Sequence, residues 1–269
     1  MASQQFKSSC GVPKLTWEGG TVERSEDSVA CETAVALVYN GISHVVMLVT
    51  PSNLEEFALG FSLSEGILDN PQQLLDFEVH ENSRGLELHL TIASEPFSRL
   101  KQHRRNLTGR TGCGLCGAEA LEQAIQAIPQ VTRDVKVAHT AVQSALLELQ
   151  NQQHLQAATG AVHAAAWCNL NGNIELLRED VGRHNALDKL LGAYYKSCEP
   201  DDGFVVVTSR ASYEMVVKTA AANVAILVAI SAPTSLAISS AKQCNVTLIG
   251  FARPRRHVVY THQNRLEDL

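Results

Sequence analysis

Short apolar segments that alternate with longer amphipathic stretches dominate the second half of the chain and restrict its fold more than any other feature. Residues 204–208, 226–230 and 246–249 are rich in valine, isoleucine and leucine, and stretches with helical patterning over 213–224 and 235–242 separate them. Parallel strands need crossovers of this length, and a strand covered on both faces is apolar throughout. We therefore predict an α/β fold with a mainly parallel mixed sheet that helices cover on both faces.

The same rhythm extends toward the middle of the chain. The patterns predict a strand over 173–178 and helices over 118–128, over 140–153 and from 186 onward. Asn185 is a favourable N-terminal cap for the last of these helices. We assign residues 118–269 to one main α/β domain.

A smaller α+β lobe is predicted over residues 21–108. Two apolar, β-prone runs flank Asn40-Gly41, the dipeptide most typical of a tight β-hairpin. A helix with an acidic first turn is expected to follow Asn53, and residues 86–92 alternate as a half-buried strand does. Residues 1–20 are polar and unpatterned, so we expect a loose N-terminal arm without secondary structure.

Composition and charge exclude several classes of protein. Hydrophobic residues make up 45% of the chain and charged residues 19%, which is ordinary for a globular core. The formal net charge of -6 argues against general nucleic-acid binding, which needs an excess of lysine and arginine. The uncharged run over 219–241 contains Asn223, Pro233 and several hydroxyl residues, so it indicates buried secondary structure rather than a membrane span. The N-terminus lacks the apolar core of an export signal, and we expect a cytoplasmic protein with reduced cysteines.

Residues 109–117 are the strongest candidate for chemistry. This segment places two of the seven cysteines, Cys113 and Cys116, among four glycines, which leave the backbone unusually free. A helix is expected to begin directly after it, and the partial positive charge of that helix start, together with Arg110, favours the thiolate form. We predict a mobile cysteine loop that carries a nucleophilic thiolate. A structural half-zinc site or a pair of buried thiols is the alternative, whereas a thioredoxin-like dithiol lacks the strand that should precede it.

His163 lies in a segment of small apolar residues. The segment resembles the start of the His-x-Glu helix in zinc nucleoside deaminases, but Ala165 occupies the position of the glutamate that shuttles the proton. No Pro-Cys-x-x-Cys motif follows either, so deamination is excluded even if the scaffold is shared. Otherwise a histidine in this setting is a hydrogen-bonded core residue.

Polar segments that follow predicted strands are candidates for binding an anionic ligand. One contains Asp180, Arg183 and His184 beside a glycine, although a capped turn explains it equally well. A second contains Ser209 and Arg210. A third runs through Phe251, Ala252, Arg253, Pro254, Arg255 and Arg256.

We expect the second and third of these segments to line one cationic pocket. In an open parallel sheet the ligand crevice lies outside the carboxyl ends of the strands. Arginine side chains hold phosphate in a bidentate manner, and Phe251 is placed to stack on a purine. A solvated basic tail is the alternative explanation for the three arginines.

At these residues the sequence resembles the FdhD family, the formate dehydrogenase accessory proteins that act as sulfur carriers. The likeness runs in order and spacing from about Glu32 to Tyr260. It rests on Gly109–Gly117, on Thr159–His163, on Glu179–Lys189, and on Thr208–Arg210 with Glu214, Met215, Val216 and Lys218.

The resemblance implies a cytidine-deaminase-like main domain without zinc catalysis, and a homodimer. Cys113 matches the persulfide-bearing cysteine and Cys116 its neighbour, while residues 251–256 match the cofactor-binding stretch, in which Pro254 is a departure. It further implies that sulfur passes from a cysteine desulfurase, through a Cys113 persulfide, to the molybdenum bis-molybdopterin guanine dinucleotide cofactor of formate dehydrogenase. GDP is then a simple mimic of that cofactor.

Two alternatives to a sulfur carrier make different predictions. A cofactor-binding chaperone without sulfur transfer keeps its cofactor affinity, and maturation persists, when both thiols are removed. A zinc-dependent hydrolase or deaminase that uses His163, Cys113 and Cys116 contains stoichiometric zinc, which metal analysis detects.

Overall fold

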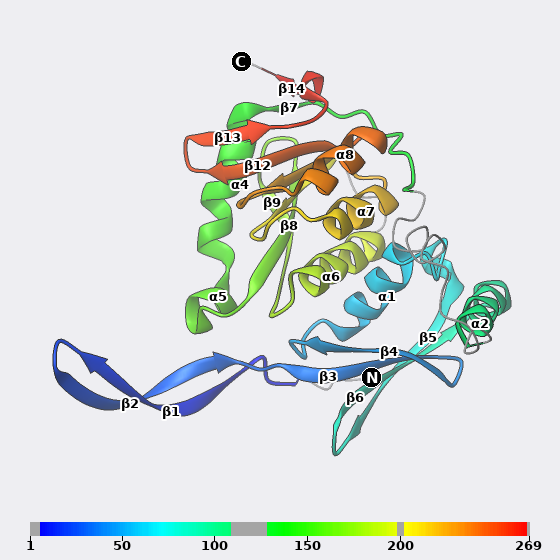
Figure 1. Ribbon diagram of the computed structural model, residues 1–269, viewed down its shortest axis with the longest axis horizontal. Coiled ribbons are helices and arrows are strands. Elements are labelled where there is room, and N and C mark those ends of the chain that lie inside the picture. Colours follow the sequence, from blue (N-terminus) through cyan, green and yellow to red (C-terminus); the bar gives the residue numbers. More distant parts are fainter. Residues whose placement is uncertain (1–5, 109–127, 198–201, 268–269) are drawn as a thin grey trace.

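The computed structural model describes residues 6–108, 128–197 and 202–267 (Figure 1). Cys113, Cys116, the predicted cysteine loop and the helix predicted from residue 118 lie outside these residues. Within the three described stretches, no helix is both long and apolar enough to cross a membrane.

A six-stranded mixed sheet forms the centre of the molecule, in the order β13-β12-β11-β10-β8-β9. Its strands are β8 (His163–Asn169), β9 (Ile174–Asp180), β10 (Gly203–Val207), β11 (Ile226–Ala229), β12 (Thr247–Arg253) and β13 (Arg256–Val259). The α/β class is confirmed. The expectation of a mainly parallel sheet is wrong, because only β10, β11 and β12 run parallel, whereas β8, β9 and β13 pair antiparallel. Helical crossovers join β10 to β11 and β11 to β12, and short turns join the antiparallel pairs β8–β9 and β12–β13.

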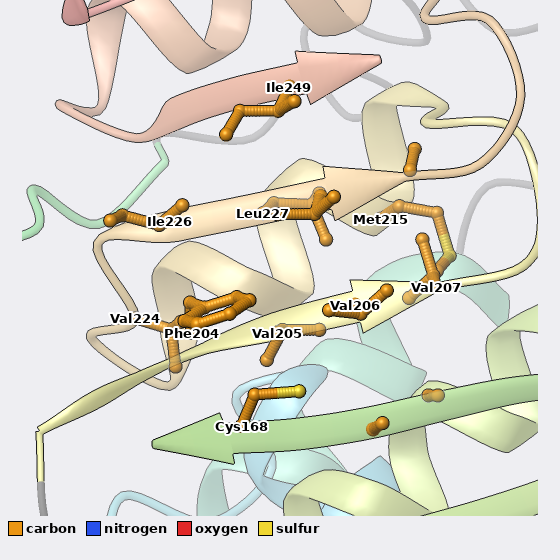
Figure 2. Packing of buried hydrophobic residues seen from close by; sticks show 14 of the residues in the cluster. Cys168, Phe204, Val205, Val206, Val207, Met215, Val224, Ile226, Leu227 and Ile249 are labelled. Atoms are coloured by element: carbon orange, nitrogen blue, oxygen red, sulfur yellow. The ribbon is translucent and has the colours of Figure 1, made fainter. Parts of the chain in front are cut away.

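Helices cover both faces of this sheet. The helices α6 (Arg183–Lys196), α7 (Tyr213–Ala221) and α8 (Ser235–Gln243) lie on one face, and α4 (His139–Gln152) packs across β12 and β9 on the other (Figure 1). Every residue of β10 and β11 is buried, as their apolar sequences predict. Figure 2 shows Phe204, Leu227 and Met215 packed in the core between sheet and helices. The remaining elements of this half are β7 (Val137–Ala138), α5 (His154–Thr159), η2 (Gln263–Arg265) and β14 (Leu266–Glu267).

A second, four-stranded sheet lies in the N-terminal part, in the order β4-β3-β6-β5. It comprises β3 (Thr33–Tyr39), β4 (Ile42–Val49), β5 (Leu74–Asn82) and β6 (Gly85–Ile92), with α1 (Leu54–Ser64), η1 (Pro71–Gln73) and α2 (Ser94–Thr108). The hairpin predicted at Asn40-Gly41 is confirmed, and both turn residues have positive φ, 45° and 81°. The helix expected after Asn53 is also confirmed as α1.

The N-terminal residues form a long β-ribbon, where the sequence predicts a loose arm. β1 (Ser9–Glu18) pairs antiparallel with β2 (Thr21–Ala30) along its whole length. Gly19 and Gly20 make the turn with φ of 56° and 92°, which glycine adopts without strain. The prediction failed because the ribbon does not bury one face, so its sequence lacks the alternation that marks a half-buried strand.

Close packing of α1 against α6 joins the two halves. A methyl group added at Gly60 would overlap the carbonyl oxygen of Asp188, and one at Gly192 would overlap that of Glu56. The predicted division into a lobe over 21–108 and a domain over 118–269 stays a prediction, because its boundary falls in residues outside the description. The cytidine-deaminase-like relationship also stays a prediction.

Candidate functional site

The three parallel strands have their carboxyl ends along one edge of the large sheet. Backbone hydrogen bonds connect the segments that follow these strands. The backbone N–H of Ser231 donates to the carbonyl of Ser209 (3.4 Å), and that of Phe251 donates to the carbonyl of Ser231 (3.1 Å). The ends of β10, β11 and β12 therefore lie side by side. This edge is where open α/β sheets bind ligands.

The antiparallel strands β8 and β9 bring His163 to the same edge. His163 opposes Asp180 in the register of β8 and β9, and the N–H of the neighbouring Ala164 donates to Oγ1 of Thr208 (2.9 Å). His163 thus begins a strand, whereas its likeness to the deaminase motif places it at a helix start. The run of alanines after it is fully buried between helices, so packing overrides the helix preference of alanine.

A hollow of about 410 Å³ opens beside His163. It is lined by Gln153, Gln156, Gly160, Ala161, Val162, His163 and Thr208. Partial burial, and secondly the positive charge of Arg183, lower the pKa of His163 below its ordinary value of 6.5, while Asp180 opposes this. His163 is therefore neutral near pH 7 and is able to donate or accept a proton at the wall of the hollow.

Arg183 and His184 lie at the start of α6, close to His163. Burial, followed by the charge of Arg183, also lowers the pKa of His184, whose Nε2 is 3.5 Å from the carboxylate of Glu214. The buried Nε of Arg183 has no hydrogen-bond partner among the residues that the structure describes. A buried guanidinium nitrogen without a partner favours binding of an acceptor from outside the chain.

Asp180 has a different environment. Its side chain is fully buried and forms an ion pair with Lys189 (2.6 Å). Its carboxylate also accepts hydrogen bonds from the backbone N–H of Thr50 (2.9 Å) and of Gly182 (2.8 Å), and from the amide of Asn185 (2.9 Å). These contacts support the reading of a capped turn, and a direct contact of Asp180 with a ligand stays a prediction that this geometry does not favour.

Ser209 and Arg210 follow β10 as expected but face different surroundings. Ser209 is buried, and its hydroxyl donates to the carbonyl of Arg210 (3.0 Å). Arg210 is exposed at the edge of the sheet. Of the two, only Arg210 presents its side chain to solvent.

Phe251 is held in a strained backbone conformation. The register between β12 and β13 shifts between Gly250 and Arg253, and Phe251 in this bulge has a φ of 49°. An aromatic residue rarely adopts this left-handed conformation, which costs on the order of 1–3 kcal/mol and persists only where the surroundings impose it. Phe251 is 40% exposed, while the following Ala252 is fully buried. The bulge therefore turns a large aromatic ring outward, as β-bulges near binding sites often do.

The β12–β13 turn borders a second hollow, also of about 410 Å³. It is lined by His139, Thr140, Gln143, Arg255, Arg256 and His257. Arg253, Pro254, Arg255 and Arg256 are exposed, and Arg255 has a φ of 66°. The backbone N–H of Arg255 donates to Oε1 of Gln143 (2.6 Å), which fixes the turn over the first residues of α4.

Two stacked histidines form the floor of this second hollow. The amide of Gln143 donates to Nδ1 of His257 (2.9 Å), so the proton of a neutral His257 lies on Nε2, 2.7 Å from Nδ1 of His139. Burial, and then the neighbouring His139, lower the pKa of His257 below 6.5. Sequence reasoning missed His139 and Gln143. Their spacing of four residues, on one face of a predicted helix, was the available signal.

The prediction of one shared pocket stays a prediction, and the described part of the chain has a separate hollow beside each of the two segments. The segment after β10 contributes Thr208 to the hollow beside His163, and the β12–β13 turn borders the other hollow. β11 and the loop after it separate the two segments, and α4 begins at one hollow and leads to the other. The 14 residues of α4 span about 20 Å, which is the approximate distance between the two hollows. The edge thus offers an extended surface with two hollows.

The described residues contain no cluster of three or more histidine, cysteine, aspartate or glutamate side chains that is able to hold a metal ion. The zinc alternative depends on Cys113 and Cys116, which lie outside the described residues.

Comparisons with known proteins agree on one family. The sequence model of the FdhD/NarQ family matches residues 30–267. A sulfur carrier protein FdhD from Cupriavidus necator is 54% identical over 252 residues, which cover 93% of this chain and 88% of the relative. A protein of the same name from Acinetobacter baylyi is 52% identical over 237 residues, 87% of this chain and 86% of the relative.

A crystal structure also resembles this fold. The protein comes from Desulfotalea psychrophila and is described as a candidate formate dehydrogenase accessory protein. Its TM-score is 0.75 at 24% sequence identity, and the likeness covers 97% of this chain and 100% of the other. At this identity, the comparison shows a shared fold.

Proposed function

This chain belongs to the FdhD/NarQ family, and on that basis we propose that it is a sulfur carrier required for formate dehydrogenase activity. Its partners are a cysteine desulfurase, which supplies the sulfur, and formate dehydrogenase, whose molybdenum bis-molybdopterin guanine dinucleotide cofactor receives it. The cofactor is the substrate here and is not a resident group. The protein works in the cytoplasm.

The sulfur is carried as a persulfide on Cys113. The Cys113 thiolate attacks the terminal sulfur of the desulfurase persulfide, a new S–S bond forms, and the electrons of the broken S–S bond leave with the desulfurase thiolate. Cys116 then assists in one of two ways. It accepts the terminal sulfur itself, or its thiolate attacks the Sγ of Cys113 and releases hydrosulfide, leaving a disulfide between the two cysteines. The release step needs no outside reductant, and a cellular dithiol reduces the disulfide before the next cycle.

The observation that best supports the proposed binding of the cofactor is the cationic rim around the β12–β13 turn. Arg255 and Arg256 border a hollow at the N-terminal end of α4, where the positive end of the helix dipole and two guanidinium groups favour phosphate. Phe251, which the bulge turns outward, supplies an apolar face on which guanine stacks. The Nε of Arg183, which has no hydrogen-bond partner in the described ranges of the chain, offers a further donor beside His163.

The decisive experiment is mass spectrometry after incubation with a cysteine desulfurase and L-cysteine. The peptide that contains Cys113 is expected to gain one sulfur atom, and Cys113→Ala is expected to abolish formate dehydrogenase maturation. Cys10→Ala removes a different, exposed cysteine and serves as the matched control. Normal maturation in Cys113→Ala would overturn sulfur transfer and would leave the cofactor-binding chaperone as the explanation.

Binding of the nucleotide part is tested separately with GDP. Arg255→Ala and Arg256→Ala are each expected to weaken GDP binding at least tenfold, since a charge-assisted hydrogen bond contributes about 1.5–3 kcal/mol. Arg84→Ala, on the exposed β5–β6 turn, is the control. If all three variants bind GDP alike in calorimetry, the rim of the second hollow does not hold the nucleotide.

A further inference from the structure

A chain of hydrogen bonds in the second hollow connects two histidines to the β12–β13 turn. The backbone N–H of Arg255 donates to Oε1 of Gln143 (2.6 Å), and the amide nitrogen of Gln143 donates to Nδ1 of His257 (2.9 Å). Nε2 of His257 lies 2.7 Å from Nδ1 of His139. A backbone N–H can only donate, so Arg255 determines which end of the Gln143 amide faces the turn and which end faces His257.

The orientation of Gln143 also determines where the protons of the histidine pair, His139 and His257, lie. Nδ1 of His257 accepts from the amide, so a neutral His257 has its proton on Nε2 and donates it to His139. Burial, followed by the neighbouring His139, lowers the pKa of His257 below 6.5. The pair is therefore neutral near pH 7, and in this state Gln143 holds the turn.

One added proton is incompatible with this arrangement, whichever ring receives it. If His257 is protonated, both of its ring nitrogens carry hydrogen. If His139 is protonated, its Nδ1 donates to Nε2 of His257, and the proton of His257 moves to Nδ1.

In both cases Nδ1 of His257 becomes a donor and faces the donor end of the Gln143 amide. A rotation of the amide by half a turn restores that hydrogen bond, because its oxygen then accepts from His257. The rotation also turns the amide nitrogen toward the N–H of Arg255, and two donors cannot bond to each other. A single proton on the histidine pair therefore breaks the hydrogen bond that fixes the β12–β13 turn.

The charged groups around the histidine pair favour an anion in the second hollow. Arg255 and Arg256 line it, Arg253 opposes Arg256 in the register of β12 and β13, and no acidic side chain of the described residues lines it. Lys136, just before α4, forms an ion pair with Glu267 (2.9 Å). A phosphate group against both rings adds negative charge beside the pair and raises its affinity for a proton.

We propose that the binding of a phosphate group in the second hollow is coupled to the uptake of one proton by the histidine pair, and that this proton, through Gln143, releases the β12–β13 turn to close over the ligand. The proton comes from solvent, and only hydrogen bonds rearrange. Gln143 and His257 are positioning residues, because they act through the turn that carries Arg255 and Arg256. This inference rests on the proposed binding of the nucleotide part of the cofactor and adds how that site is regulated.

Hydrogen exchange of the Arg255 N–H, measured by NMR without ligand, tests the switch itself. After correction for the intrinsic exchange rate, its protection is expected to be about fivefold lower at pH 5 than at pH 7.5, the factor for one hydrogen bond. Gln143→Leu, which lacks the acceptor, is expected to show the low protection at both pH values. Gln143→Glu is expected to show the high protection at both, because a carboxylate accepts from Arg255 and from a protonated His257 at once.

The coupling to phosphate is tested with GDP in calorimetry at pH 8 and pH 7. The terminal phosphate has a second pKa of about 6 and is largely ionised in this range. The dissociation constant of the wild type is expected to fall several-fold from pH 8 to pH 7, toward the limit of about tenfold that one coupled proton sets. In His257→Gln it is expected to stay constant, whereas His80→Gln, on the exposed face of β5, keeps the wild-type dependence.

Two results would overturn the proposal. Protection of the Arg255 N–H that does not depend on pH means that Gln143 does not respond to the histidine pair. A GDP affinity of the wild type that is the same at pH 8 and pH 7 means that phosphate binding takes up no proton, although the nucleotide site itself would stand. If GDP does not bind at either pH, the proposed nucleotide site and its coupling both fail, and the exchange of the Arg255 N–H still decides whether the switch exists.

Discussion

Replacing Lys189 with methionine is expected to lower the free energy of unfolding by about 4 kcal/mol, within the 3–5 kcal/mol that breaking a buried ion pair costs. The side chains of Lys189 and Asp180 are both fully buried, with Nζ and Oδ2 2.6 Å apart. Methionine fills a similar volume, so the change removes a charge more than it removes packing.

The loss is large because Asp180 keeps its position when its cation is gone. Its carboxylate stays tied to Thr50, Gly182 and Asn185, and these neutral donors do not replace the compensating charge. The carbonyl oxygen of Thr50 also loses its hydrogen bond from Lys189 Nζ (2.8 Å). Thr50 follows β4, so the same substitution loosens the contact between the two sheets.

Urea unfolding followed by Trp167 fluorescence and far-UV circular dichroism measures the effect. Lys196→Met is the matched control on the same helix. Lys196 forms a comparable 2.8 Å ion pair with Glu55, but its side chain is 42% exposed, and such pairs contribute about 0–1 kcal/mol. If Lys189→Met and Lys196→Met destabilise equally, burial does not decide the strength of these pairs and the reasoning is refuted.

Two further predictions concern packing and pH. Gly192→Ala forces a methyl group into the carbonyl of Glu56 and is expected to cost about 3 kcal/mol in urea unfolding, whereas Gly11→Ala, which meets no neighbour, costs almost nothing. Burial lowers the pKa of three histidines in the folded protein, so the unfolded chain binds protons at a higher pH than the folded protein does. The urea concentration at the midpoint of unfolding should therefore fall as the pH drops below 6.5. A midpoint that rises toward pH 5 would contradict this. The histidines are His163, His184 and His257.

Local signals in the sequence predicted the elements whose formation depends on their own residues. Asn40-Gly41 specifies the β3–β4 turn because few other residues accept positive φ at both positions. The continuous valine run of β10 specifies a strand buried on both faces. The predictions of these two elements are correct because local preference and burial favour the same structure.

Strand direction and the location of His163 depend on longer-range contacts. β8 is a run of small residues that is compatible with a helix, and it becomes a strand only because β10 and β9 pair with it on either side. The same pairing makes the sheet mixed. The prediction for the residues of the β1–β2 ribbon failed for a different reason. Neither face of the ribbon is buried in the chain, so burial imposes no periodic pattern on its sequence.

In the candidate site, too, the sequence shows which residues are available, and longer-range contacts decide what neighbouring residues of one motif do. Asp180 and Arg183 are three residues apart and equally suited, from the sequence, to bind an anionic or polar ligand. The backbone of Thr50, 130 residues before Asp180, then commits the aspartate to the interior, while the Nε of Arg183 is left buried without a described partner. A motif therefore defines which chemistry is available, and contacts from the other sheet decide which of its side chains are left to perform it. For this reason Arg183→Lys, which keeps the charge but lacks Nε, should weaken GDP binding without lowering stability if Arg183 contacts the ligand, and should leave both GDP binding and stability unchanged if it does not.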